Sequence, residues 1–102
     1  MRVISQHGNV DLPYEQIVVC HAMENVTALH NEKEYVLGRY SSQEKAYKAM
    51  EMLREQYGLL SFMKLIAGTT NYESFIRRFT EDDFIKATTE YFQFPQDDEI
   101  EV

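Results

Sequence analysis

The first part of the chain alternates between short apolar runs and turn signals, which is the pattern of β-strands. The run "RVIS" at residues 2–5 meets a turn signal at residues 7–9. Residues 10–14 can continue extended, with Pro13 confining them to a sheet edge or a bend. The run "QIVVCHA" at residues 16–22 carries apolar side chains on both faces, so we expect the central strand of a sheet there.

Two further turn signals predict a β-meander. Glu24 and Asn25 suit a two-residue turn, after which the run at residues 26–30 returns. Residues 31–33 form the second turn signal, and the alternating run at 34–40 makes a third strand of the meander.

After residue 40 the spacing of apolar residues changes from the alternation of a strand to the period of a helix. Apolar residues recur every three or four positions between residues 41 and 57, which predicts an amphipathic helix. Ser41 followed by Glu44 suits a capping box at its start, and Gly58 suits its end. We expect this helix to lie across one face of the meander. The apolar stripe consists of Ala46, Met50, Leu53 and Tyr57.

Beyond that helix the pattern is less regular. The run at residues 59–68 is apolar nearly throughout and fits either a helix or a buried strand. Residues 71–79 predict a short helix with Asn71 as N-cap, and Thr80 suits the N-cap of another at residues 80–87.

The last apolar run predicts a closing strand. Residues 88–95 place Phe92 and Phe94 on one side, and Pro95 ends the run. The predicted fold class is therefore α+β: an antiparallel β-meander of four to five strands, one long helix packed on it, one or two short helices and a returning C-terminal strand. A chain of 102 residues holds these elements in a single domain.

The acidity of the chain is concentrated at its C-terminal end. The net charge is −7, whereas the chain before residue 96 holds 13 acidic and 10 basic residues and is near neutral. We interpret the tail as the solvated end of the closing strand, with a mimic of nucleic-acid phosphates as the alternative. The lack of a basic stripe argues against direct nucleic-acid binding. The acids of the tail are Asp97, Asp98, Glu99 and Glu101.

Cysteine content and hydropathy bear on the compartment. The single cysteine, Cys20, rules out an internal disulfide and fits a reducing cytoplasm. No run approaches the ~18 consecutive apolar residues of a membrane span. The first ten residues lack the apolar core of a signal peptide. We therefore expect a cytoplasmic protein without a membrane partner.

Residue types that carry catalysis or bind metals do not converge in the sequence. The predicted first hairpin would make His21 and His30 diagonal neighbours on one sheet face, without a third ligand for zinc. Cys20 would point to the opposite face as a buried core cysteine rather than a nucleophile. The acid runs at residues 81–83 and 97–99 fan outward. With no nucleotide-binding, zinc-binding or hydrolase motif either, we predict a protein that is not an enzyme and has no catalytic residue, metal site or cofactor.

The stretch "NYESFIRRF" at residues 71–79 combines aromatic and basic side chains. Aromatic faces beside guanidinium groups suit a site for a nucleobase and phosphate, and they equally suit a protein or homo-oligomer interface. The third interpretation is an ordinary amphipathic helix with its aromatics in the core and its arginines in water. The candidate binding residues are Tyr72, Phe75, Arg77, Arg78 and Phe79.

Several blocks together resemble a group of short proteins from phages, prophages and gut Firmicutes genomes. These blocks are "MRVISQHG", "DLPYE", "LGRYSSQEKAYKAMEMLREQY" and "FQFPQDDEIEV", although His7 stands where the group commonly has Asp. The resemblance implies a mobile-element origin and a constant frame around a variable insert. It divides the single domain into a meander plus helix at 1–58, a variable segment at 59–87, a closing strand at 88–95 and an acidic tail at 96–102.

The resemblance, rather than any residue, implies a function. It suggests a small non-catalytic binding protein that antagonises a bacterial host defence system by stoichiometric protein binding in the host cytoplasm. One alternative is an oligomeric sponge that sequesters a nucleotide-derived immune signal. Another is a structural or accessory protein with no defence role. The expected partner is a host protein or a second copy of the chain.

Overall fold

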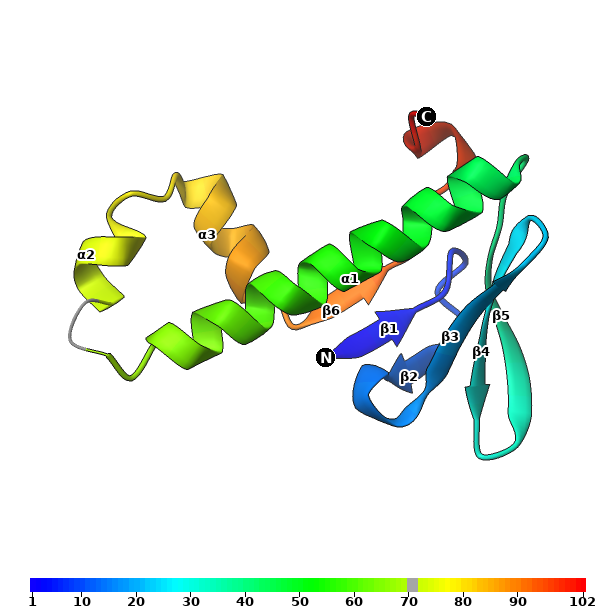
Figure 1. Cartoon of the computed structure of the whole chain (residues 1–102), viewed down its shortest axis with the longest axis horizontal. Coiled ribbons are helices and arrows are strands. Elements are labelled where there is room, and N and C mark those ends of the chain that lie inside the picture. Colours follow the sequence, from blue (N-terminus) through cyan, green and yellow to red (C-terminus); the bar gives the residue numbers. More distant parts are fainter. Residues whose placement is uncertain (70–71) are drawn as a thin grey trace.

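The protein is an α+β fold in which two small sheets and one long helix share a hydrophobic core (Figure 1). The computed structural model describes residues 1–69 and 72–102, except for the side chain of Phe75. The α+β class predicted from the sequence is confirmed. The elements are β1 (Arg2–Ile4), β2 (Asp11–Pro13), the 3-10 helix η1 (Tyr14–Gln16), β3 (Val18–Ala22), β4 (Asn25–His30), β5 (Lys33–Arg39), α1 (Gln43–Ile66), α2 (Tyr72–Ile76), α3 (Glu81–Thr88), β6 (Tyr91–Gln93) and the 3-10 helix η2 (Asp97–Glu99).

The strands are divided between two sheets rather than joined in one meander. β3, β4 and β5 form the antiparallel meander, whereas β2, β1 and β6 form a second sheet. The closing strand β6 returns as predicted, but it runs parallel to β1 and does not pair with the meander. Parallel strands need a long crossover, and the helices between β5 and β6 return the chain to the end of the fold where a parallel strand can start.

The position of β3 also differs from the prediction. The order β3-β4-β5 makes β4 the central strand, so β3 lies at an edge. α1 packs over the inner face of this sheet, where Val26 and Ala28 of β4 are fully buried. On the outer face Val18 is 61% exposed and Cys20 is also exposed, so the prediction of a buried core cysteine is wrong. The apolar run of β3 is therefore covered by α1 on the inner face of the sheet and is exposed to solvent on the outer face.

The first hairpin turns at Met23-Glu24, one residue earlier than predicted. Asn25 is already part of β4 and pairs with Ala22, so the cross-strand register differs from the prediction by two residues. His21 lies near the turn, whereas His30 lies at the other end of β4. The predicted proximity of the two histidines is therefore wrong.

The second hairpin holds two non-glycine residues in the left-handed region. Asn31 has a φ of 51° and Glu32 a φ of 67°, as in the two-residue turns whose twist matches that of the flanking strands. Asparagine adopts this region readily, whereas a longer side chain such as that of glutamate is strained there.

Replacing Glu32 by glycine should raise the free energy of unfolding by about 0.5–1 kcal/mol, because glycine adopts positive φ without strain. Urea unfolding followed by far-UV circular dichroism measures the change. Glu34→Gly is the matched control, since it removes the same charge from the interior of β5 and should destabilise the protein. Equal effects of the two substitutions would mean that backbone strain at Glu32 is not the cause.

Helix α1 begins one residue later than the predicted cap indicates, and it continues well beyond the predicted stop at Gly58. Its N-cap is Ser42, whose hydroxyl accepts from Lys45 N over 3.2 Å, rather than Ser41. The helix runs through Gly58, which faces open space, and ends at Ile66. It continues past glycine because its next two turns bury Leu60 and Met63. The ambiguous run at residues 59–68 is therefore mainly helix.

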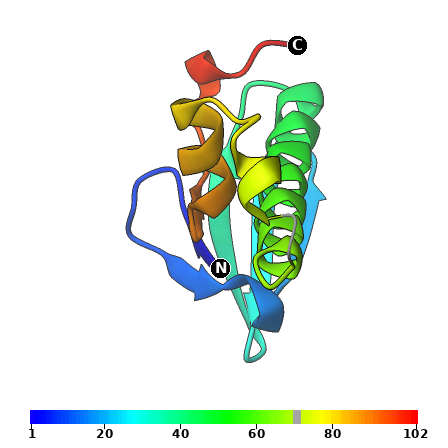
Figure 2. The ribbon, with the colours of Figure 1, turned by 90° about the vertical axis from the view of Figure 1, so that its left-hand side faces the viewer.

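The second half of α1 forms a helical lobe with α2 and α3, comprising residues 56–69 and 72–89 (Figures 1 and 2). Gln56 is buried and its amide donates to Lys86 O over 2.8 Å and to Thr89 O over 3.2 Å. This residue therefore ties α1 to the end of α3. The predicted cap of α3 is confirmed, because Thr80 Oγ1 accepts from Asp83 N over 3.1 Å.

The acidic tail is docked rather than simply solvated. Ile100 is 5% exposed and belongs to the same core cluster as Phe94 and Val3. Asp97 accepts from Ser41 N over 2.7 Å, and Lys45 Nζ donates to its carboxylate over 3.3 Å. The expectation of a solvated end therefore fits the exposed acids Asp98, Glu99 and Glu101, but not Asp97.

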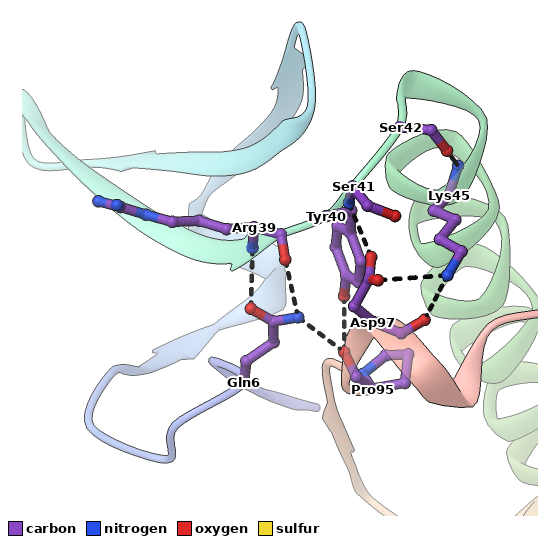
Figure 3. A network of polar contacts seen from close by, with 8 residues as sticks. All are labelled: Gln6, Arg39, Tyr40, Ser41, Ser42, Lys45, Pro95 and Asp97. Atoms are coloured by element: carbon purple, nitrogen blue, oxygen red, sulfur yellow. Dashed lines mark hydrogen bonds and ion pairs between the residues drawn. The ribbon is translucent and has the colours of Figure 1, made fainter.

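A glutamine completes this closure (Figure 3). Gln6 Oε1 accepts from Arg39 N over 2.8 Å, while its amide donates to Arg39 O over 3.2 Å and to Pro95 O over 3.0 Å. The Tyr40 hydroxyl donates to the same Pro95 carbonyl over 2.9 Å. Burial raises the pKa of Tyr40 well above its usual range, so this hydroxyl stays a donor. Gln6 thus links the segment after β1, the end of β5 and the segment after β6.

The docking of Asp97 predicts an acid-dependent loss of stability. The hydrogen bond from Ser41 N, with Lys45 beside it, lowers the pKa of Asp97 below its ordinary value of 3.8. A lowered pKa contributes stability that is fully present above the unfolded value and is lost as pH falls through the folded value. Asp97→Asn should therefore be less stable than the original protein at pH 7, and the difference should shrink below about pH 4. Asp98→Asn is the control; a difference that does not change with pH would contradict this role of the charge.

Candidate binding site on the helical lobe

The structure places the predicted binding residues around α2, at the end of the molecule remote from the meander (Figure 1). Arg77 and Arg78 are exposed in the turn after α2. Tyr72 and Phe79 are half-buried, and the side chain of Phe75 lies outside the described part of the chain. The turn is closed by Arg77 N, which donates to Glu73 O over 3.2 Å.

The two guanidinium groups are open to solvent and available to a partner. Within residues 1–69 and 72–102, neither group makes a hydrogen bond or an ion pair. Arginine in this state offers five donors in a planar fork that suits carboxylates, phosphates and aromatic faces. The exposed arginines fit the interpretation of an ordinary amphipathic helix, but that interpretation also placed the aromatics in the core, and Tyr72 and Phe79 are only half-buried.

The cavity beside Tyr72 does not bring the arginines and aromatics together. It has a volume of about 180 Å³, below the 300–1,000 Å³ of a usual small-molecule site. Lys64 and Glu90 lie at its rim with 3.3 Å between Nζ and Oε1. A nucleotide site at this position would therefore need residues from a neighbouring subunit. The lining residues are Leu60, Met63, Lys64, Ala67, Tyr72, Thr88 and Glu90.

Exposed apolar side chains on the same lobe were missed in the sequence. Phe62 is 43% and Leu65 76% exposed, one turn apart on α1, and Ile85 of α3 is also exposed. The signal was present in the run at residues 59–68. A helix that is apolar all round and buried on one side leaves apolar residues in water on the other. Aromatic and aliphatic groups beside arginines are the composition of protein interfaces.

A larger hollow lies elsewhere, between the N-terminal half of α1 and the C-terminal tail. It is shallow, with a volume of about 570 Å³. The ring of His21 meets that of Tyr47 edge-on, with 6.2 Å between centroids, and Lys48 Nζ lies 3.7 Å from Glu51 Oε2. Lys48 and Glu51 offset one another, which leaves Glu44 and Glu101 as the other acidic groups of the lining. The lining residues are His21, Gln43, Glu44, Tyr47, Lys48, Glu51, Glu101 and Val102.

Metal-binding and nucleophilic side chains do not form a cluster in the part of the chain that the structure describes. No three histidine, cysteine, aspartate or glutamate side chains there are placed to hold a metal ion. The exposed thiol of Cys20 lies 3.3 Å from Thr27 Oγ1, which is a hydroxyl rather than a base. In the same residues, no helix combines the length and apolarity needed to cross a membrane.

The fold and the lobe define a small α+β protein with a projecting helical lobe. No family model matches the sequence, and neither the curated proteins nor the solved structures give a match.

Proposed function

We propose that this chain is a non-catalytic binding protein that acts by stoichiometric contact with another protein through its helical lobe. The observation that carries the proposal is the presence of exposed Phe62 and Leu65 together with Arg77 and Arg78 on that lobe. The phage and prophage resemblance gives this contact its biological setting, the antagonism of a bacterial host defence system.

The exposed apolar groups are the first support. Single exposed leucines are common on protein surfaces. Leu65 and Phe62, however, lie one turn apart on one helix, and the same lobe carries two unpaired arginines. Fully burying an exposed leucine or phenylalanine is worth about 1.5–3 kcal/mol. Leu65, at 76% exposed, can gain most of this on binding, and Phe62, at 43%, less than half. Arginine and aromatic residues are also the types that most often dominate binding energy.

The internal packing of the lobe is the second support. Buried Gln56, Leu60 and Met63 lie on the second half of α1, and the amide of Gln56 bonds it to the end of α3. A surface held by such contacts is preformed, so less conformational entropy is lost when a partner binds. The constant frame would then present a variable contact surface.

A charge reversal on the lobe tests the proposal. The chain, carrying an affinity tag, is used to capture proteins from lysate of a bacterium whose defence system blocks a given phage. Arg77→Glu/Arg78→Glu should lower recovery of the captured protein at least about tenfold, which corresponds to about 1.4 kcal/mol. Lys33→Glu/Arg39→Glu is the matched control, because it makes the same charge change at exposed positions of β5 and should retain the partner.

The proposed antagonism of a host defence system is tested separately, by plaque formation. Expression of the original chain should restore plaque formation by the blocked phage, and the lobe variant should not. Equal capture by the two double variants would show that the lobe is not the contact surface. Retained capture without restored plaques would show that the binding has no role in countering that defence.

A further inference from the structure

The edge strand β3 has an open row of backbone groups. Among the residues that the structure describes, β4 is its only partner strand, and the pair Ala22 and Asn25 closes a two-residue turn. A closing pair exchanges its hydrogen bonds across the hairpin, and hydrogen-bonded pairs then alternate along an antiparallel ladder. The N–H and C=O groups of Val19 and His21 therefore point away from β4, toward the open edge.

The edge of β3 lacks the features that keep strand edges from pairing. Proteins protect edges with charged residues, proline, bulges or very short strands. β3 has five residues and contains no charge, proline or register shift. The other edges carry such features: β5 holds Lys33, Glu34 and Arg39 and a register shift in its pairing, β2 holds Asp11 and Pro13, and β6 has only three residues.

We propose that two copies of this chain dimerise by antiparallel pairing of their β3 strands into one continuous sheet. Full overlap of Val18–Ala22 places Cys20 opposite the partner's Cys20 on the twofold axis. Val19 then lies opposite the partner's His21. Because both residues direct their backbone groups outward, each such pair exchanges both N–H···O bonds. No two like charges are opposed in this register.

The surroundings of β3 favour a second copy over an unrelated strand. Near the start of β3 lies a hollow of about 160 Å³ whose lining includes Tyr14, Ile17 and Val19. Near the end of β3 stand Tyr47, which is 52% exposed and contacts His21, and Met23, which is 74% exposed. Antiparallel pairing sets the start of one strand against the end of the other. It therefore brings the exposed groups of each copy toward the hollow of its partner, as an isologous interface requires.

The salt dependence of binding also distinguishes a second copy of the chain from a foreign strand. Each copy carries a net charge of −7, so two copies repel one another at low salt. Screening by salt should therefore strengthen the dimer. A basic foreign strand attracted to the acidic chain should instead bind more weakly as salt rises.

Disulfide cross-linking tests the register directly. Two directly opposed residues of a non-hydrogen-bonded pair have Cα atoms about 4.5 Å apart, within the range of a disulfide. Diamide should oxidise the two Cys20 thiols to a disulfide, taking up their two protons and two electrons, and give a covalent dimer that dithiothreitol reverses. The matched variant Val18→Cys/Cys20→Ser also carries its thiol at an exposed position of β3, but the two thiols lie four positions out of register and should cross-link at least about tenfold more slowly. Equal rates would overturn the register.

Sedimentation equilibrium tests the dimer without any covalent step. The original chain should be dimeric at about 100 µM in 0.5 M salt and dissociate further at low salt. His21→Pro should be monomeric, since proline at this edge position removes an outward N–H and leaves the bonds to β4 in place. Circular dichroism checks that this variant is folded. A monomeric original chain under these conditions, or a folded His21→Pro variant that stays dimeric, would overturn the proposal.

Discussion

Replacing Ile100 by alanine should lower the free energy of unfolding by about 3 kcal/mol, the usual cost of removing a buried isoleucine. The side chain is 5% exposed and packs in the core with Phe94 and Val3. The residue lies in a tail whose composition predicts solvation, so the size of the effect separates a docked tail from a solvated one. Because the chain has no tryptophan, far-UV circular dichroism during urea unfolding is the suitable signal.

Val102→Ala is the matched control for Ile100. It also shortens a β-branched side chain in the tail, but Val102 is exposed, so the change should stay within about 0.5 kcal/mol. If Ile100→Ala were as mild as the control, the tail would not be part of the core. A large loss restricted to Ile100 would mean that residues 96–102 belong to the folding unit.

Replacing Gln6 by alanine should lower the free energy of unfolding by about 2–4 kcal/mol, because several part-buried polar groups lose a hydrogen bond at once. Pro95 O still accepts from the Tyr40 hydroxyl, whereas Arg39 N and O lose the amide of Gln6. Arg39 N and O and Pro95 O all bond to this one side chain (Figure 3). Gln6 is itself buried, so water replaces these contacts poorly. Thermal and urea unfolding of the purified variant measure the loss.

Gln93→Ala supplies the comparison for Gln6. Its side chain is exposed and makes one long hydrogen bond, 3.4 Å to Ser5 O, so the substitution should have little effect. Tyr40→Phe should fall between the two, since it removes one donor to the Pro95 carbonyl while Gln6 still serves it. An effect of Gln6→Ala no larger than that of Gln93→Ala would contradict the role of Gln6 as the link between the segments.

Local signals in the sequence predicted the elements that depend on neighbouring residues. The cap at Thr80, the turn after β4 and the joint orientation of Phe92 and Phe94 are confirmed. The relation between elements could not be predicted in the same way. Whether β3 lies at an edge or in the centre depends on what pairs with it, and its apolar residues fit both positions.

The candidate site shows the same division. The exposure of Arg77 and Arg78 follows from their charge and could be predicted. Phe62 and Leu65 were missed because periodicity does not distinguish a buried strand from a helix in a continuously apolar run. The burial of Leu60 and Met63 shows that α1 continues past Gly58 as a helix. Because Phe62 and Leu65 lie on another side of that helix, they are exposed.

The parallel pairing of β1 with β6 has a consequence for synthesis on the ribosome. Arg2 pairs with Tyr91, so a nascent β1 has to wait roughly ninety residues for that neighbour. The two hairpins of the meander need only adjacent segments and can form much earlier. During most of translation, therefore, the edge of β1 that pairs with β6 is open, and Val3 lacks its neighbour Phe92. Chaperone contacts with the nascent chain should concentrate on this strand.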